Sequence, residues 1–357
     1  MINEVIASVY PLDENAMAAA RQRQAQLAKP PVSLGRLEDL SVQLAGITGN
    51  VHNKIEKKHL LVFAADNGVV AEGVSSAPQS VTLMQTINLT RHKTGASTLC
   101  KHFGCDITVC DVGVNADIAE PAVLNRKIAY GTQNIAKGPA MTRQQAETAI
   151  LTGIELAKKT EADAIGIGEM GIGNTTTSSA VLSVLLDAEV ETVTGRGGGI
   201  TDDGFRKKKE VIQTAIAVNR PDRNDVLDVL AKVGGFDIAA MCGAFIGAAA
   251  THRPVVIDGF ISAVAALCAV RLCPNVKGYL VPSHASYEIG YKLAMDAMEL
   301  RPMLLLDMRL GEGSGCPLAF EVLSAACAII NDMATFDEAG INDDYLEEIR
   351  QGDKFTP

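Results

Sequence analysis

The hydrophobic positions of this chain fall into short apolar runs separated by longer segments in which apolar residues recur at helical spacing. The short runs predict buried strands at residues 59–65, 106–112, 162–167, 254–257, 277–281 and 303–306. Between them, helical periodicity dominates, for example from Thr142, which forms a capping box with Gln145, to about Lys159. Strands that alternate with helices build a parallel sheet, so the predicted fold class is α/β with a doubly wound, mostly parallel sheet.

Two helices come before the first predicted strand. The first covers residues 14–29, and Pro30 and Pro31 end it before Ser33, which can cap a second helix at 34–44. An isolated helical start predicts a small helical domain, which the acidic tail after Phe336 can join. We therefore expect a small domain of residues 1–50 and roughly 334–357, and a large α/β domain of residues 51–333.

Composition narrows the class of protein. The 357 residues carry a net charge of −10 and no long basic run, which argues against nucleic acid as a partner. The eight cysteines lie mostly in apolar segments without a CxxC pair, and the six histidines show no metal-ligand spacing, so we expect reduced core cysteines and no metal. The first ten residues lack a basic signal-peptide region, and the apolar runs are shorter than a membrane span. A cytoplasmic protein is predicted.

A glycine-rich segment at residues 166–186 follows the strand 162–167 and continues into a helix. Gly166, Gly168 and Gly171 match the dinucleotide fingerprint GxGxxG, and one of three acidic residues stands near the distance expected for a ribose contact: Asp187, Glu189 or Glu191. Gly173 prolongs the turn, and the helix opens with Asn174 and three threonines. Free amides and hydroxyls at a helix N-terminus favour a terminal phosphate over a bridging pyrophosphate. A tight crossover with helix caps is the alternative without a ligand.

Further polar groups follow predicted strands and glycine turns. The GRGGGI segment at residues 195–200 precedes a helix with Lys207, Lys208 and Lys209, of which one can face a ligand while the others are solvated. Asp237 and Asp258 can bind ribose hydroxyls, although helix capping is the simpler role. His284 can serve as acid, base or polar contact, but a nucleophilic triad would need a GxSxG elbow, which the chain lacks.

Glu312 stands between two glycines, after the apolar run 303–306 and before a helix of small residues that starts near Gly315. A helix dipole lowers a carboxyl pKa by less than about one unit, whereas burial in an apolar pocket raises it by up to about 3–5 units. In a dry pocket Glu312 would therefore have a pKa near neutral pH, which suits a general base. A helix-capping glutamate without a chemical role is the alternative.

Ten motifs now occur together in one order. They are GRLE (35–38), AADNGV (64–69), GASTLC (95–100), DVGV (111–114), GIGEMGIGNTTTSSA (166–180), GRGGGI (195–200), GGFDIAAMCGAF (234–245), DGFISAVAAL (258–267), PSHASYEIG (282–290) and LDMRLGEGSG (306–315). In this combination the chain resembles the nicotinate-nucleotide–dimethylbenzimidazole phosphoribosyltransferase family, from Pro31 to Met333.

The resemblance implies a Rossmann-like α/β domain, a small helical domain built from both chain ends, and a homodimer. It implies transfer of the 5-phosphoribosyl group of nicotinate mononucleotide to 5,6-dimethylbenzimidazole, with inversion at C1′ and without a cofactor. Nicotinate and α-ribazole 5′-phosphate, for the lower ligand of cobalamin, would be the products.

The same resemblance assigns residues. Glu312 matches the general base, and Glu169 a second acid near the ribose or the reaction centre. The 5′-phosphate would bind Gly171, Gly173, Asn174, Thr175, Gly197 and Lys208, and the benzimidazole would contact Gln79, Met84 and Leu310. The preferred base is left open. Two other functions rest on the residues alone, an NAD-dependent dehydrogenase using residues 166–171 and a non-catalytic nucleotide-binding module.

Overall fold

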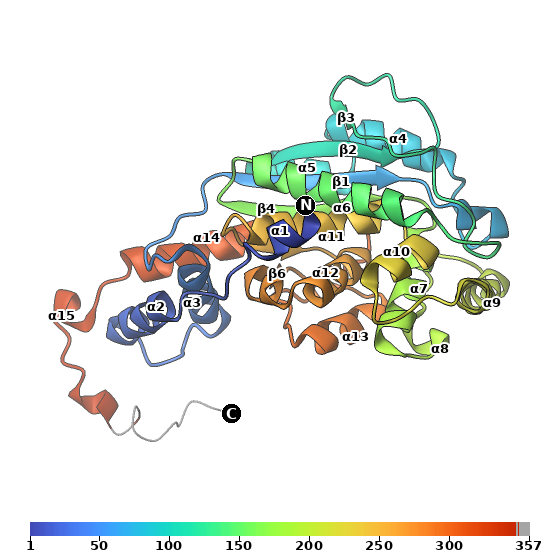
Figure 1. Cartoon of the computed structure of the whole chain (residues 1–357). Coiled ribbons are helices and arrows are strands. Elements are labelled where there is room, and N and C mark those ends of the chain that lie inside the picture. Colours follow the sequence, from blue (N-terminus) through green and yellow to red (C-terminus); the bar gives the residue numbers. More distant parts are fainter. Residues whose placement is uncertain (348, 350–357) are drawn as a thin grey trace. The chain divides into compact units, whose positions relative to one another are not determined.

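In this computed structural model, which describes residues 1–347 and 349, the described chain forms one six-stranded parallel sheet (Figure 1). The strand order is β3-β2-β1-β4-β5-β6. The strands are β1 (Lys58–Ala65), β2 (Asp106–Gly113), β3 (Val123–Asn125), β4 (Ala164–Met170), β5 (Val255–Ile257) and β6 (Leu280–Pro282). The predicted α/β class with a doubly wound parallel sheet is therefore confirmed.

Helices connect β1 to β2, β3 to β4, β4 to β5 and β5 to β6. From β1 the chain runs to β2 through η1 (Gly68–Glu72), α4 (Ser80–Thr90) and α5 (Gly95–Phe103), and from β3 to β4 through α6 (Arg143–Lys159). Between β4 and β5 lie α7 (Asn174–Leu186), α8 (Val190–Val193), α9 (Asp202–Asn219), α10 (Val226–Val233) and α11 (Phe236–Ala249). The remaining elements of this region are α1 (Ile2–Ile6), α12 (Phe260–Leu272), η2 (Pro274–Tyr279) and α13 (Ile289–Met298).

The direction of winding reverses between β1 and β4, which are neighbours in the sheet although β2 and β3 separate them in sequence. Their register pairs Phe63 with Glu169 and Ala64 with Met170, so both strands end at the same edge. In open parallel sheets, ligands bind outside the carboxyl ends of the strands at such a reversal. This edge therefore positions the site.

Close backbone packing of α6 against α11 forms much of the core, because glycines face carbonyl groups across the contact. A Cβ on Gly153 would overlap the Ala240 carbonyl, and a Cβ on Gly243 would overlap the Ile150 carbonyl. Every residue of α11 is buried. Small residues thus replace the aromatic packing that a chain with no Trp and 4% aromatic residues lacks.

Several predicted elements differ in the structure. Residues 303–306 are not a buried strand: Leu304 forms an isolated bridge with His284, and Leu305 is 83% exposed. Residues 277–279 belong to the 3-10 helix η2, so β6 begins only at Leu280. Apolar runs this short do not distinguish a strand from an exposed loop or a tight helical turn.

Two further corrections concern helix and strand ends. Gly35 precedes α3 (Arg36–Thr48), with φ of 49° and no side-chain cap, so Ser33 is not the cap. Strand β4 continues to Met170, three residues beyond the predicted end. Gly166 and Gly168 are therefore strand residues, and the phosphate-binding turn of a dinucleotide fingerprint does not form there. The dehydrogenase hypothesis loses its structural basis.

The described chain separates into two compact units. The large unit comprises Met1–Tyr10 and Lys57–Ala319 and contains the sheet; the small unit comprises Pro11–Glu56 and the chain from Phe320. The small unit holds α2 (Glu14–Gln26), α3, α15 (Phe336–Ala339) and η3 (Asp344–Leu346), while α14 (Cys316–Asp332) begins in the large unit. The predicted division at residues 50 and 334 stays a prediction, and residues 348 and 350–357 of its tail lie outside the described residues.

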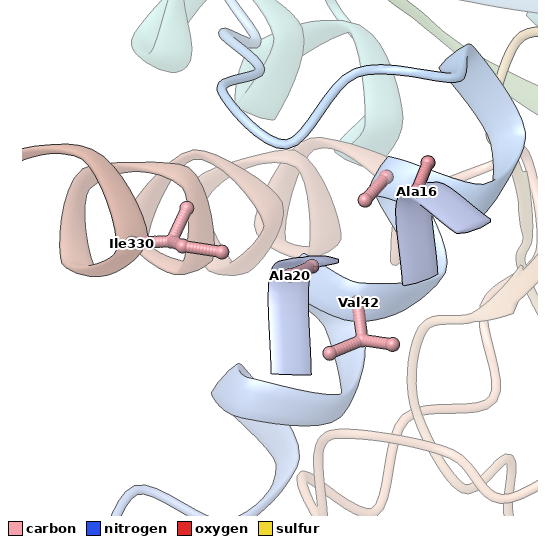
Figure 2. Close-up of a cluster of buried hydrophobic side chains, with 5 residues drawn as sticks. Ala16, Ala20, Val42 and Ile330 are labelled. Atoms are coloured by element: carbon pink, nitrogen blue, oxygen red, sulfur yellow. The ribbon is translucent and has the colours of Figure 1, made fainter. Parts of the chain in front are cut away.

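The small unit has an apolar cluster of its own (Figure 2). Ala16 and Ala20 of α2 meet Val42 and Ala45 of α3 and Ile330 near the end of α14. Residues from both ends of the chain thus share one core. Among the described residues, no helix is both long and apolar enough to cross a membrane.

Candidate active site

A cleft of about 250 Å³ opens at the carboxyl ends of β4 and β5. Its wall combines glycine turns, buried carboxyl groups and a few apolar side chains. The lining includes Val81, Gln85, Glu169, Gly171, Gly173, Asn174, Thr175, Arg196, Gly197, Asp258, His284, Glu288, Arg309, Leu310 and Glu312. The structure therefore brings together eight of the predicted site residues from three separate segments.

The turn between β4 and α7 forms one wall. Gly171 lies so close to β1 that a Cβ would overlap the Ala65 carbonyl oxygen, and Gly173 has a φ of 91°. Only glycine fits both positions without strain. At the start of α7 the Asn174 N–H donates to the Gly171 carbonyl at 3.1 Å and the Thr176 N–H to the Gly173 carbonyl at 2.9 Å. The positive end of the α7 dipole nevertheless lines the cleft at Asn174 and Thr175, where it favours an anion.

Lys208 is the buried member of the lysine run. It is 1% exposed, and its Nζ donates to Thr175 Oγ1 at 2.9 Å and to the Gly195 carbonyl at 3.0 Å. Burial lowers its pKa to about 8, and nearby Glu288 opposes this shift. Lys207 is exposed, and Lys209 lies over the Phe205 ring. Lys208 does not line the cleft but supports Thr175, which does.

Glu312 has a left-handed backbone, with φ of 63° between Gly311 at 86° and Gly313 at 84°. Its side chain is buried, and Ala96 at the start of α5 donates its N–H to Oε2 at 3.0 Å. Burial raises the pKa of Glu312, and the like charge of Asp258 adds to this, while hydrogen bonds from Ala96 and Thr94 oppose it. The side chain therefore binds an amide at the start of α5 and also lines the cleft, and its role as a base stays a prediction.

A buried polar cluster lies beside Glu312. The Asn174 side-chain amide donates to Glu169 and, at 3.0 Å, to Asp237 Oδ2. Burial, followed by the charge of Asp237, raises the pKa of Glu169 to about 8, and burial raises that of Asp237 to about 6. Glu169 is therefore mostly protonated at neutral pH, and the Asn174 side chain is engaged with carboxyl groups rather than free for a phosphate.

This burial predicts a pH-dependent stability. A carboxyl group whose pKa is higher in the folded state than in the unfolded state makes the fold less stable as pH rises. For Glu169 this loss occurs between the unfolded pKa of 4.5 and the folded pKa of about 8. For Glu169 this amounts to about 3–5 kcal/mol. We expect Glu169→Gln to reduce the decline of the unfolding free energy between pH 5 and 8, measured by urea unfolding. Exposed Glu210→Gln is the matched control, and an unchanged slope in Glu169→Gln would contradict the assignment.

The residues predicted for the base pocket are only partly assembled. Leu310 lines the cleft and lies so close to Gly95 that a Cβ there would overlap its Cδ2. Gln79 and Met84 do not line the cleft: Gln79 accepts a hydrogen bond from Asn115, and Met84 is 58% exposed. Helix α4 instead presents Val81 and Gln85. Their four-residue spacing places them on one helix face, a signal present in the sequence.

The other sequence candidates take supporting places. Arg196 lines the cleft, but its guanidinium pairs with Asp202 at 2.5 Å. Asp258 and Asp237 bind backbone amides. Among the described residues, no group of three or more His, Cys, Asp or Glu side chains could hold a metal ion.

Comparison with known proteins fits this architecture. A sequence model of a family described as phosphoribosyltransferase matches residues 9–341. The match covers most of the chain, so the chain belongs to this class of enzymes.

Individual relatives define the family further. The nicotinate-nucleotide–dimethylbenzimidazole phosphoribosyltransferase of Clostridium perfringens (strain 13 / Type A) is 50% identical over 353 residues, 98% of either chain. Its namesake in Ruminiclostridium cellulolyticum is 52% identical over 341 residues, 95% of this chain and 97% of the relative. A crystal structure of the enzyme from Thermus thermophilus superposes with a TM-score of 0.88 at 39% identity, covering 93% of this chain and 99% of the other. The chain is a member of the nicotinate-nucleotide–dimethylbenzimidazole phosphoribosyltransferase family.

Proposed function

We propose that this protein transfers the 5-phosphoribosyl group of nicotinate mononucleotide to 5,6-dimethylbenzimidazole, with inversion at C1′. The products are nicotinate and α-ribazole 5′-phosphate, which serves the lower ligand of cobalamin. One observation carries this proposal: the start of α7 and the buried side chain of Glu312 line the same cleft. The relatives that share this chain's length are named for the same two substrates.

The chemistry follows from these two ends of the cleft. The phosphate binds at Gly171, Gly173 and the first turn of α7, which fixes the ribose. The benzimidazole nitrogen attacks C1′ from the face opposite the nicotinate, whose glycosidic bond breaks as its pyridinium nitrogen takes back the electron pair. Glu312 accepts the proton that the attacking imidazole loses. Glu169, protonated at neutral pH, is the second carboxyl at the reaction centre. Holding both bases in line is the main task of the cleft.

The direct test is a product assay by chromatography. We expect purified protein to release nicotinate only when nicotinate mononucleotide and 5,6-dimethylbenzimidazole are both present. Incubation with either substrate alone is the control. An unchanged mixture would refute the transferase and leave a non-catalytic nucleotide-binding protein. A shift in the cofactor's own fluorescence on titration with NADH would instead favour a dehydrogenase. Competing several benzimidazoles in one mixture identifies the preferred base.

A homodimer is part of the proposal. Four apolar side chains on two segments are exposed: Tyr287, Ile289, Leu305 and Leu306. The two segments are adjacent, because the Ala285 N–H donates to the Leu304 carbonyl at 2.8 Å. Clustered exposed apolar residues mark protein interfaces. We expect Leu305→Glu to shift the sedimentation coefficient towards a monomer.

The control for this test is Val218→Glu on α9, which is also an exposed apolar position. A dimer that survives Leu305→Glu and dissociates with Val218→Glu would place the interface elsewhere.

We also propose a cytoplasmic location, supported by eight buried free cysteines. The expectation that nucleic acid is not a partner rests on the net charge of −10 and on a sequence without a long basic run.

A further inference from the structure

The turn that carries Glu312 is bound by two buried carboxyl groups. Asp258 accepts the Gly313 N–H on Oδ2 at 3.0 Å and the Gly315 N–H on Oδ1 at 2.7 Å. The N–H of Glu312 itself donates to Glu169 Oε1 at 3.3 Å. Three backbone N–H groups within four residues therefore donate to carboxyl groups, one on β4 and one at the end of β5.

This support opposes an unfavourable backbone. A residue with a side chain in the left-handed region is strained, and such strain persists only where surrounding contacts hold it. The turn is also packed tightly against its neighbours: a Cβ on Gly168 would stand 2.6 Å from the Glu312 carbonyl oxygen. A Cβ on Gly315 would stand 2.5 Å from Ser283 Oγ. The conformation of Glu312 thus depends on its hydrogen bonds and on two glycines.

Asp258 is itself fixed to the sheet. It follows the last residue of β5 and is 2% exposed, and its N–H donates to Ser262 Oγ at 3.2 Å. Ser262 Oγ donates in turn to the Ile167 carbonyl in β4 at 3.1 Å. A continuous set of hydrogen bonds therefore runs from β4 and the end of β5 through Asp258 to Gly313 and Gly315, on the C-terminal side of Glu312.

We propose that Asp258 is a positioning residue for the transfer reaction, because its carboxylate holds the backbone turn that aims Glu312 at the benzimidazole. The proposal rests on the proposed function of the cleft. Asp258 also lines the cleft, so direct contact with the nucleotide is the competing role. The two roles differ in kinetics: a misaimed base lowers kcat, whereas a lost substrate contact raises the KM for the nucleotide.

The test uses Asp258→Asn and Asp258→Ala in the full chain. Asparagine keeps one acceptor and turns its NH₂ towards the second amide, and alanine loses both acceptors. We expect kcat to fall about 10–100-fold in Asp258→Asn and further in Asp258→Ala, with KM for nicotinate mononucleotide changed less than about threefold. If the alanine variant does not fold, the kcat and KM of the asparagine variant still test the positioning role of Asp258.

Two controls separate positioning from general destabilisation. Asp111 is equally buried and accepts the N–H groups of Gly113 and Val114 at 3.0 and 2.8 Å, but it does not line the cleft. Asp111→Asn should therefore keep the wild-type kcat. In a Glu312→Gln background, Asp258→Asn should lower kcat less than about threefold further, because the residue it acts through is already disabled.

The outcomes are distinct. Multiplicative losses in the double variant, a kcat loss shared by Asp111→Asn, or a change confined to KM would each overturn the positioning role while leaving the transferase intact. Wild-type protein that releases no nicotinate would refute the proposed function itself, and the role of Asp258 with it.

Discussion

Glu312→Gln is expected to lower kcat by about 10²–10⁴-fold, the range that a positioned general base contributes. Glutamine keeps the shape of the side chain and an oxygen that can accept the Ala96 N–H, so the turn and α5 remain joined. It cannot accept the imidazole proton. Affinity for the nucleotide should change less than about threefold, measured by calorimetry, because the phosphate binds at the other end of the cleft.

The same residue predicts a pH profile. Burial raises the pKa of Glu312, and only its deprotonated form is a base, so kcat/KM of the wild type should fall as pH drops through that raised pKa. The acid limb should therefore lie above the ordinary glutamate range and be absent from Glu312→Gln. Glu210→Gln, exposed on α9, should retain the wild-type profile. Near wild-type turnover in Glu312→Gln would refute the base assignment.

Lys208→Met should weaken binding of nicotinate mononucleotide by about 10–100-fold, the effect of losing a charge-assisted hydrogen bond in a buried site. Lys208 supports Thr175 at the start of α7, where the phosphate is expected. The stability of the fold should change little, because burial already disfavours the ammonium, whose pKa is lowered to about 8. Methionine fills a similar volume without that charge.

Neighbouring lysines provide the matched controls for this experiment. Lys207→Met and Lys209→Met remove the same charge from positions that are exposed or lie over Phe205, and both should bind the nucleotide as the wild type does. Binding of the corresponding nucleoside, which lacks the phosphate, should be equal in all three variants. An equal loss of nucleotide binding in all three variants would indicate a general electrostatic effect of the lysines rather than the specific support that Lys208 gives to Thr175.

The alternation of strands and helices was enough to predict the parallel sheet, and helix starts such as Thr142 were marked by their caps. The proximity of Glu169 and Glu312 could not be predicted from residue spacing, because glycines within a strand have the same sequence pattern as a glycine turn. Residue 168 of β4 has to be glycine because the turn at Glu312 packs directly against its Cα. This contact joins residues that are far apart in the sequence. Sequence spacing does not carry such a constraint.

Other parts of the site had a local signal that goes beyond the motif. Lys208 shares a helix face with Val211, Ile212 and Ala215, all buried, so the helical period alone separates it from Lys207 and Lys209. The cluster of Glu169, Asn174 and Asp237 has no such signal, because its members come from three different elements. Their raised pKa values arise from burial that only the folded chain creates.

The left-handed backbone of Glu312 has a consequence for how this protein can be improved. Glycine adopts that conformation freely, whereas a residue with a Cβ is destabilised there by about 1–2 kcal/mol. Selection for heat resistance alone would therefore favour glycine at position 312, and selection for turnover would favour glutamate. A stability–activity trade-off is thus built into a single backbone angle, and thermostable variants should be sought away from residues 311–313.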